Sequence, residues 1–221
     1  MSVETRTLPH RFIVVEGPIG VGKTTLARRL TESFGGELVR ELADENPFLE
    51  RFYRDPRTAA LPTQLFFLFQ RARQISALRQ SDMFAPLYVS DFMFEKDRLF
   101  AQLLLDEEEY KLYDQVFNGL AVELIRPDLV IYLQAPVEVL QKRIAKRGIA
   151  FERHITDDYL ARLNNAYTSF FYSYQGSPLL IVNAAEIDFA DNEKDYNLLL
   201  EQICAVRNGR RFFNPIPMKW S

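Results

Sequence analysis

The chain has 221 residues, a formal net charge of −3 and a single cysteine, Cys204. At this length, one α/β domain over residues 1–221 can bury a substantial core without disulfides or a structural metal. A nearly balanced charge argues against a protein that binds nucleic acid, although it leaves small anionic ligands open. With one cysteine, no signal peptide and no bilayer-length apolar run, we expect a soluble cytoplasmic protein without a membrane partner.

A glycine-rich motif, Gly17-Pro18-Ile19-Gly20-Val21-Gly22-Lys23-Thr24, follows the apolar run 12–15 and precedes an amphipathic segment that starts at Thr25. It matches the phosphate-binding P-loop, G-x-x-x-x-G-K-[ST], in its strand–loop–helix context. Backbone N–H groups would surround an anion, Lys23 would reach the β- and γ-phosphates, and the Thr24 hydroxyl would bind Mg²⁺. A ligand-free turn is the alternative, but the spacing and both flanking elements favour a nucleoside triphosphate site that includes Thr25.

The next segment predicts a short strand that ends beside the P-loop. Gly35-Gly36 indicates the end of the first helix, and residues 37–40 have the character of a strand. Glu41 would then stand at the carboxyl end of a strand, where open α/β sheets build their sites.

Two helices are predicted after Glu41. The first would begin with Asp44 as its N-cap and reach about residue 53, before the break at Asp55-Pro56. The second, over about 63–80, has apolar residues at helical spacing. Gln64 and Arg71 lie two turns apart on it, so their side chains should point the same way.

The remaining elements alternate between strands and helices. Strands are predicted over residues 86–90, ending at Asp91, over 129–133 and over 179–182. Helices are predicted over 94–125 with an interruption near the acidic run 106–109, over 157–174, and from the polar loop at 191 to about 206. Residues 208–221 have the composition of an extended tail. Alternation of this kind predicts a parallel, doubly wound sheet.

A basic segment lies between residues 141 and 153, with Lys142, Arg143, Lys146, Arg147 and Arg153. On a helix, Arg143 and Arg147 are one turn apart, and so are the two lysines, which gives one basic stripe. The simplest interpretation is a solvated face. Beside a P-loop, the pattern favours a lid over about residues 141–155 whose arginines contact the transferring phosphates.

Taken together, these motifs resemble the deoxynucleoside kinase family, in particular its bacterial deoxyadenosine and deoxyguanosine kinases, over about residues 12–205. The resemblance is carried by Glu16 to Thr25, by Glu41 followed by Glu45-Asn46-Pro47-Phe48-Leu49, by the spacing of Tyr53, Gln64 and Arg71, by Asp91 with Asp97, and by Lys146-Arg147-Gly148 with Glu152. It implies a P-loop NTPase fold with five parallel strands in the order 2-3-1-4-5, flanking helices, a helical lid and a homodimer.

The resemblance also implies roles for individual residues. Glu41 would be the general base for the 5'-hydroxyl, with Lys23, Arg143 and Arg147 on the phosphates and Asp91 joining Thr24 at Mg²⁺. Gln64, Arg71 and Asp97 would read the base, Tyr53 and Glu152 would hold the sugar, and Asp188 and Phe189 would cover the base of ATP. The alternatives are a surface acid for Glu41, a packing tyrosine for Tyr53 and a structural ion pair for Arg71 with Asp97.

Two positions depart from the family pattern. Phe92 follows Asp91 where much of the family has an arginine, and Ile149 stands where many lids have another arginine. The first leaves the cation near the 5'-hydroxyl unassigned, and the second leaves open which lid arginine contacts phosphate.

The implied reaction is ATP- and Mg²⁺-dependent phosphorylation of the 5'-hydroxyl of a deoxynucleoside for nucleotide salvage, with deoxyadenosine or deoxyguanosine favoured and deoxycytidine left open. A nucleoside monophosphate kinase is the nearest alternative, but it needs cations for the acceptor phosphate. A GTP-binding switch would carry N-K-x-D and D-x-x-G motifs, which are absent from the sequence. A non-catalytic nucleotide-binding regulator remains the last alternative.

Overall fold

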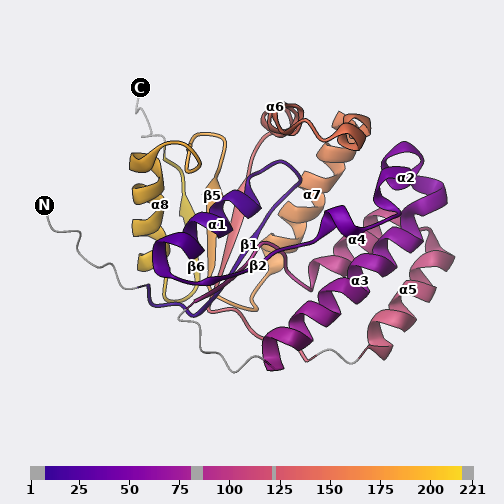
Figure 1. Ribbon diagram of the computed structural model, residues 1–221, viewed down its shortest axis with the longest axis horizontal. Coiled ribbons are helices and arrows are strands. Elements are labelled where there is room, and N and C mark those ends of the chain that lie inside the picture. The colour runs from indigo at the N-terminus through magenta and orange to yellow at the C-terminus, as the bar shows by residue number, and fades with distance from the viewer. Residues whose placement is uncertain (1–7, 81–86, 121–122, 216–221) are drawn as a thin grey trace, which may run out of the picture.

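A six-stranded parallel sheet runs through the computed structural model, which describes residues 8–80, 87–120 and 123–215 (Figure 1). The strand order is β2-β3-β1-β4-β5-β6, and every neighbouring pair is parallel. The strands are β1 Phe12–Glu16, β2 Glu37–Val39, β3 Tyr88–Ser90, β4 Leu129–Gln134, β5 Leu179–Asn183 and β6 Arg210–Phe213. Residue 86, predicted to begin the third strand, lies outside the described residues.

The sixth strand corrects the prediction of five. β6 lies in the segment 208–221 that was expected to be a tail, and it pairs with β5 from Leu179↔Arg210 to Val182↔Phe213. Gly209, at φ 65°, provides the left-handed turn that leads into it. Because three of its four residues are exposed, β6 lacks the apolar run by which a buried strand is recognised. Residues 216–221 lie outside the described part.

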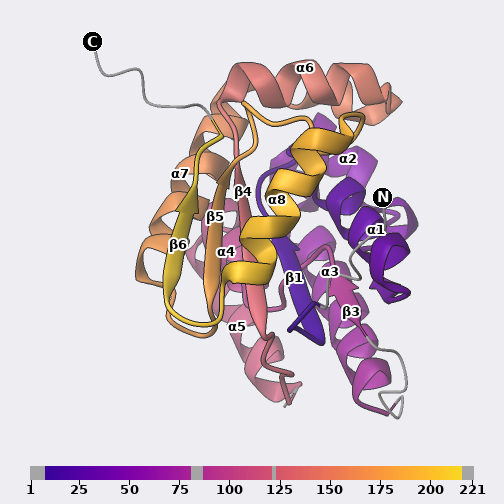
Figure 2. The same ribbon diagram turned by 90° about the vertical axis from the view of Figure 1, so that its left-hand side faces the viewer.

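Helices cover both faces of the sheet. Figure 2 shows α8 in front of the strands and α7 behind them. The helices are α1 Lys23–Phe34, α2 Leu49–Arg54, α3 Pro56–Gln80, α4 Lys96–Leu104, α5 Glu107–Gly119, α6 Val137–Arg147, α7 Asp157–Ser173 and α8 Glu193–Ala205, with 3₁₀ turns at Ala43–Glu45 and Ala150–His154. Within the described residues, none of these helices combines the length and apolarity needed to cross a bilayer.

Alternate residues of β1 enter two different cores. Ile13 and Val15 pack with residues of α1, α6 and α8, whereas Phe12 and Val14 pack with residues of α3 and α7. All five residues of the strand are buried. The central strand is therefore apolar on both faces, as expected of a parallel sheet between two helical layers.

The helix boundaries differ from prediction where local backbone chemistry decides them. Asp44 does not begin a helix, because Asn46 precedes a proline and is held in an extended conformation, with φ −79° and ψ 107°. The Asn46 Oδ1 atom accepts from the Phe48 N–H at 3.0 Å, and α2 starts just afterwards. The long helix starts earlier than predicted, at Pro56, which is a favourable first residue.

The acidic run near residue 106 is the start of a helix. The Asp106 side chain accepts from the N–H groups of Glu108 and Glu109, and the Glu109 side chain accepts from the Asp106 N–H, which is a capping box. α5 then ends at Gly119, before the predicted limit of 125.

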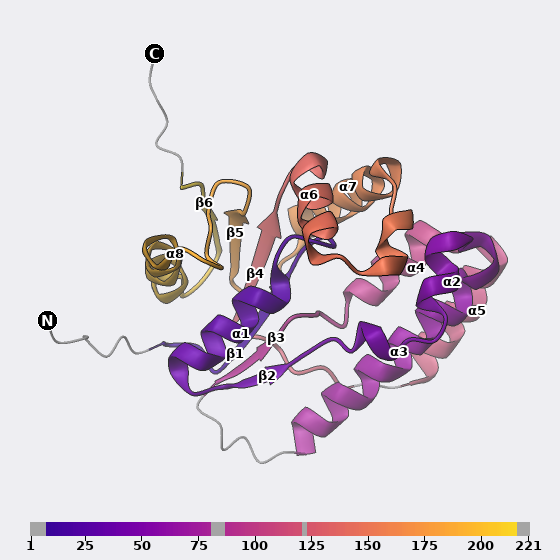
Figure 3. The ribbon, with the colours of Figure 1, turned by 45° about the horizontal axis from the view of Figure 1, so that its top comes forward.

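The strand order places a crevice beside β1. The chain leaves β1 toward β2 on one side and leaves β4 toward β5 on the other side, so the direction of the connections reverses at β1. Figure 3 shows α6 beside the loop that joins β1 to α1, and the segment after α6 extends toward α2. The P-loop, the end of β2 and the predicted lid therefore meet at one edge of the sheet.

Candidate active site

A cavity of about 390 Å³ lies at this edge, between the P-loop, α2, α3 and the segment after α6. It is lined by nine of the predicted site residues that carry side-chain chemistry: Lys23, Thr24, Glu41, Tyr53, Gln64, Arg71, Asp91, Arg147 and Glu152. The cavity therefore brings together residues that lie far apart in the sequence.

The P-loop is shaped by its glycines and by the strand behind it. Gly22 has φ 107°, and a Cβ atom there would lie 3.0 Å from the Phe189 ring, so a side chain would be both strained and crowded. The Lys23 ammonium donates to the Gly17 carbonyl at 2.8 Å and to the Pro18 carbonyl at 3.2 Å. Burial, reinforced by nearby Lys96, lowers the pKa of Lys23. These contacts keep the lysine at the mouth of an anion-binding loop.

Asp91 connects the P-loop helix to the end of β2. Its Oδ2 atom accepts from the Thr24 hydroxyl at 2.5 Å, and its Oδ1 atom accepts from the Glu41 N–H at 2.6 Å. A hydroxyl and a carboxylate thus stand together at the carboxyl ends of β1 and β3. Both groups are oxygen donors of the kind that Mg²⁺ prefers.

The backbone around Glu41 is held from α3. The Gln74 amide donates to the Arg40 carbonyl at 2.7 Å, and the Gln70 amide donates to the Leu42 carbonyl at 3.1 Å. Glu41 therefore has hydrogen bonds on both flanking residues as well as on its own N–H. Its carboxylate position is set by tertiary contacts and not by the short strand alone.

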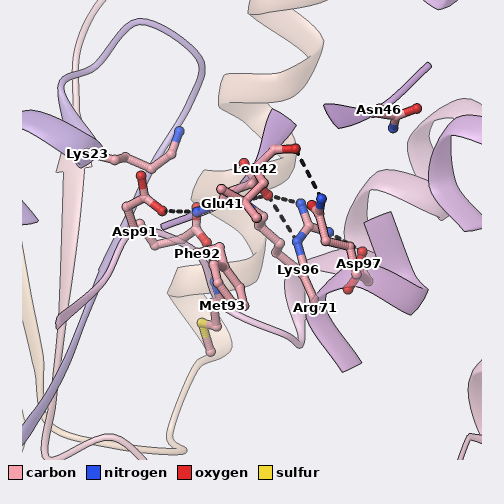
Figure 4. Close-up of polar contacts among 12 residues, drawn as sticks. Lys23, Glu41, Leu42, Asn46, Arg71, Asp91, Phe92, Met93, Lys96 and Asp97 are labelled. Atoms are coloured by element: carbon pink, nitrogen blue, oxygen red, sulfur yellow. Dashed lines mark hydrogen bonds and ion pairs between the residues drawn. The ribbon is translucent and has the colours of Figure 1, made fainter. Parts of the chain in front are cut away.

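The Glu41 carboxylate joins a buried ionic cluster (Figure 4). The Arg71 Nε atom donates to Glu41 Oε1 at 3.0 Å, its Nη2 atom donates to the same oxygen, and its Nη1 atom donates to Asp97. Lys96 lies 3.2 Å from Glu41 Oε1. Arg71, Lys96 and Asp97 are all at most 3% exposed.

The pKa values in this cluster follow from burial and from the neighbouring cations. Burial alone would raise the pKa of Glu41, but Arg71, Lys96 and Lys23 together lower it well below its ordinary value. For Asp97, burial dominates and raises the pKa to about 6, against the pull of Arg71 and Lys96. Both groups are therefore carboxylates at neutral pH.

The Gln64 side chain is buried in the wall of the cavity. Gln64 is 3% exposed, and its side chain makes no hydrogen bond to any residue that the structure describes. Phe67, one turn further along α3, also lines the cavity and has the Arg71 guanidinium 4.9 Å from its ring centroid. A planar amide beside an aromatic ring is suited to a flat heterocycle.

The opposite wall is formed by α2 and the segment after α6. Tyr53 stacks on Phe151 with ring centroids 6.0 Å apart, and burial raises the pKa of the Tyr53 phenol. Arg147 donates from Nε to Glu152 at 3.0 Å and from Nη2 to its other oxygen at 2.5 Å. The predicted lid is thus a helix, α6, followed by a 3₁₀ turn that delivers Glu152 to the cavity.

Not all of the predicted lid arginines reach the cavity. Arg143 does not line it, and instead donates to the carbonyls of Val21 at 3.0 Å and Ala184 at 2.7 Å, which places it on the far side of the P-loop. Arg153 is exposed and donates to the Ala150 carbonyl.

The loop after β5 carries the two residues predicted to cover the donor base. Phe189 is 3% exposed and packs against Gly22, while its carbonyl accepts from Arg29 at 2.8 Å. The Asp188 carboxylate accepts from the N–H groups of Ala190 and Asp191. Their predicted contact with ATP stays a prediction.

Three further residues complete the site and were not assigned from the sequence. Glu16 is fully buried and accepts from the Tyr167 hydroxyl at 3.0 Å, from the Gly17 N–H at 3.1 Å and from the Met93 N–H at 2.9 Å. Lys96 and Tyr167 line the cavity. A carboxylate directly before the P-loop was the available signal for Glu16, whereas Lys96 stands in a charged run that is typical of a solvated surface.

The fold and this cavity define a P-loop phosphotransferase with an acceptor compartment beside its phosphate-binding loop. The family model for deoxynucleoside kinase matches residues 13–206, and the chain belongs to that family. It is therefore an enzyme that phosphorylates deoxynucleosides.

Named relatives are similar in sequence to this chain over most of its length. It is 31% identical over 199 residues to deoxyguanosine kinase of Bacillus subtilis, covering 87% of this chain and 95% of the relative. It is also 31% identical over 208 residues to deoxyadenosine kinase of Lactobacillus acidophilus, covering 87% and 94%. Among solved structures, deoxyadenosine kinase from M. mycoides with bound dATP gives a TM-score of 0.76 at 26% identity, covering 88% of this chain and 99% of that one.

Proposed function

We propose that the enzyme transfers the γ-phosphoryl group of ATP to the 5'-hydroxyl of a purine deoxynucleoside. The observation that carries this proposal is one cavity that joins the P-loop, the Glu41 carboxylate and the Gln64 amide, which has no hydrogen-bond partner among the described residues. These groups are arranged in the order phosphate, sugar and base. Relatives at 31% identity that are named deoxyguanosine and deoxyadenosine kinase support a purine over cytosine.

In the proposed reaction, the protein acts by positioning and by neutralising charge. Glu41 accepts the proton of the 5'-hydroxyl, and its lowered pKa keeps it ionised and ready to do so at neutral pH. Lys23 and Arg147 contact the transferring phosphates, and Arg143 supports the P-loop from behind. Glu152 and Tyr53 hold the sugar, while Gln64, with Arg71 and Asp97, reads the base.

The residues present fit a magnesium ion between Thr24 and Asp91. Within the described residues there is no group of three or more His, Cys, Asp or Glu side chains that would form an all-protein metal cage. Mg²⁺ is instead held commonly by one or two side chains together with substrate phosphates and water. Bound there, the ion would neutralise charge on the phosphates, and Thr24 and Asp91 would be its protein ligands.

A nucleoside monophosphate as acceptor is less compatible with the cavity. Arg147 is assigned to the transferring phosphates, and the other lining arginines, Arg40 and Arg71, are each paired with a carboxylate of the protein, Arg40 with Asp44 at 3.5 Å. An acceptor phosphate would have to displace one of these carboxylates and leave it beside another anion. A neutral nucleoside hydroxyl needs no such exchange.

The proposal extends to a cytoplasmic homodimer that serves nucleotide salvage. In this proposal the Leu112 side chain on α5, which is 49% exposed, contacts the second copy. Light scattering on the purified protein tests this part directly, since a monomeric mass would exclude the dimer.

The test of the reaction is ADP release from ATP and Mg²⁺ with a panel of acceptors: four deoxynucleosides, the matching ribonucleosides and the corresponding monophosphates. We expect turnover with deoxyadenosine or deoxyguanosine and none with monophosphates. Turnover with monophosphates alone would contradict the assigned acceptor and, with it, the roles of Gln64, Arg71 and Asp97.

A further inference from the structure

Lys96 is buried in a place where a lysine is costly. It is the first residue of α4 and is 3% exposed, although a cation at a helix N-terminus opposes the helix dipole and a buried ammonium loses its hydration. Neither helix formation nor packing accounts for a positive charge here. The carboxylates around Lys96 account for its charge.

Two acids face the Lys96 ammonium. Glu41 Oε1 lies 3.2 Å away and Glu16 Oε1 lies 3.5 Å away. Lys96 donates to Glu16 Oε1, but Glu16 also accepts three other hydrogen bonds, from Gly17, Met93 and Tyr167, so its charge has partners besides the lysine. Glu41 Oε1 is the nearer of the two acceptor atoms.

The other cation that contacts Glu41, Arg71, also binds a second acid. Arg71 contacts both Glu41 and Asp97 from the interior of α3, on the base side of the cavity. Lys96 approaches from α4, beside the residues that support the P-loop, as Figure 4 shows for Lys96, Arg71 and Asp97 around Glu41. The two cations therefore hold one carboxylate from two elements.

Resting on the proposed function, we propose that Lys96 is a positioning residue for phosphoryl transfer, which holds the Glu41 carboxylate beside the P-loop while Arg71 serves the base pocket. Lys96 acts through Glu41, so it affects the rate of phosphoryl transfer and not the recognition of the base.

The experiment compares Lys96→Met and Lys96→Arg with the wild type and with Lys111→Met, an exposed lysine of α5 paired only with Glu107 among the described residues. For Lys96→Met we expect kcat to fall about 100-fold with the KM for the deoxynucleoside nearly unchanged. Lys96→Arg should recover most of the lost kcat because it keeps the charge, and Lys111→Met should match the wild type. An unchanged kcat in Lys96→Met, or a loss carried by KM alone, would overturn the assignment.

A double variant separates this role from simple neutralisation of Glu16. Glu16→Gln with Lys96→Met removes both buried charges, so it should fold even if Lys96→Met alone does not. A double variant that turns over more slowly than Glu16→Gln alone supports the role through Glu41, whereas equal kcat values in these two variants would mean that Lys96 only neutralises Glu16. An inactive wild type would overturn the proposed function itself, while an active wild type with an unaffected Lys96→Met would overturn this inference alone.

Discussion

The donor side and the acceptor side of the cavity are built in two different ways. On the donor side, residues 17–24 form one continuous loop, and Lys23 is held by two carbonyls of that same loop. On the acceptor side, the polar groups come from separate elements, and Glu41, Arg71 and Asp97 are held by one another across them. The phosphate site is therefore a local structure, and the acceptor site is a product of the whole fold.

This difference predicts how each side responds to change. A donor-side substitution removes a contact to ATP and leaves the protein's own contacts nearly intact. An acceptor-side substitution disturbs a buried charge balance, in which Asp97 Oδ2 already lacks a hydrogen-bond partner among the described residues. The following experiments test whether the two sides are separable in this way.

Glu41→Gln should have the largest effect, because it removes the proposed general base, which lies between the two sides. We expect kcat to fall about 1,000-fold while ATP binding, measured by calorimetry, persists. Glu50→Gln, an exposed acid on α2 paired with Arg54, is the matched control and should leave kcat unchanged. An unchanged rate in Glu41→Gln would remove Glu41 from the mechanism.

Lys23→Met tests whether the donor side acts independently of the acceptor. We expect kcat to fall about 100-fold and ATP to bind more weakly, with the same relative preference among deoxynucleosides as the wild type. Steady-state kinetics with deoxyadenosine and deoxyguanosine measures both quantities. A changed preference between these two acceptors would show that the sides are coupled.

The sequence predicted the donor side well because its determinants are contiguous. The spacing of the P-loop glycines, the preceding apolar strand and the following helix are visible in one window, and the structure places all three as expected. The parallel sheet was predictable for the same reason, since β1 and β4 are continuous apolar runs. β6 was missed because a short, exposed edge strand with two arginines has no such pattern.

The acceptor side could be predicted in its residues but not in its contacts. The spacing of Gln64 and Arg71 showed that they share a helix face, yet the joint hold of Arg71 and Lys96 on Glu41 depends on how α3 and α4 pack. In the sequence, Lys96 lies between Glu95 and Asp97 and has the character of a solvated charge. Whether such a residue is buried is decided by tertiary structure, which local patterns do not contain.

Gln64→Leu should change recognition of the base with little effect elsewhere. Since the Gln64 side chain has no hydrogen-bond partner among the described residues, its loss leaves no protein group unpaired. We expect the KM for the deoxynucleoside to rise about tenfold, with kcat and the free energy of unfolding nearly unchanged. Gln80→Leu, at the exposed end of α3, serves as the control, and an equal change in both variants would argue against a specific role for Gln64.

The last prediction concerns the effect of Asp97 on the free energy of unfolding. Burial raises the pKa of this residue from 3.8 to about 6. A carboxyl with a raised pKa binds its proton more tightly in the folded state than in the unfolded state. Its contribution to stability is therefore full below about pH 4 and is lost as the pH rises through 6.

Asp97→Asn, which cannot titrate, isolates this contribution. We expect the free energy of unfolding of the wild type, relative to the variant, to increase by about 2 kcal/mol as the pH falls from 7 to 4. Urea unfolding of both proteins across this range measures the difference. The opposite slope would mean that attraction to Arg71 outweighs the cost of burying Asp97. The ion pairs of the acceptor side would then stabilise the fold at neutral pH by more than their desolvation costs.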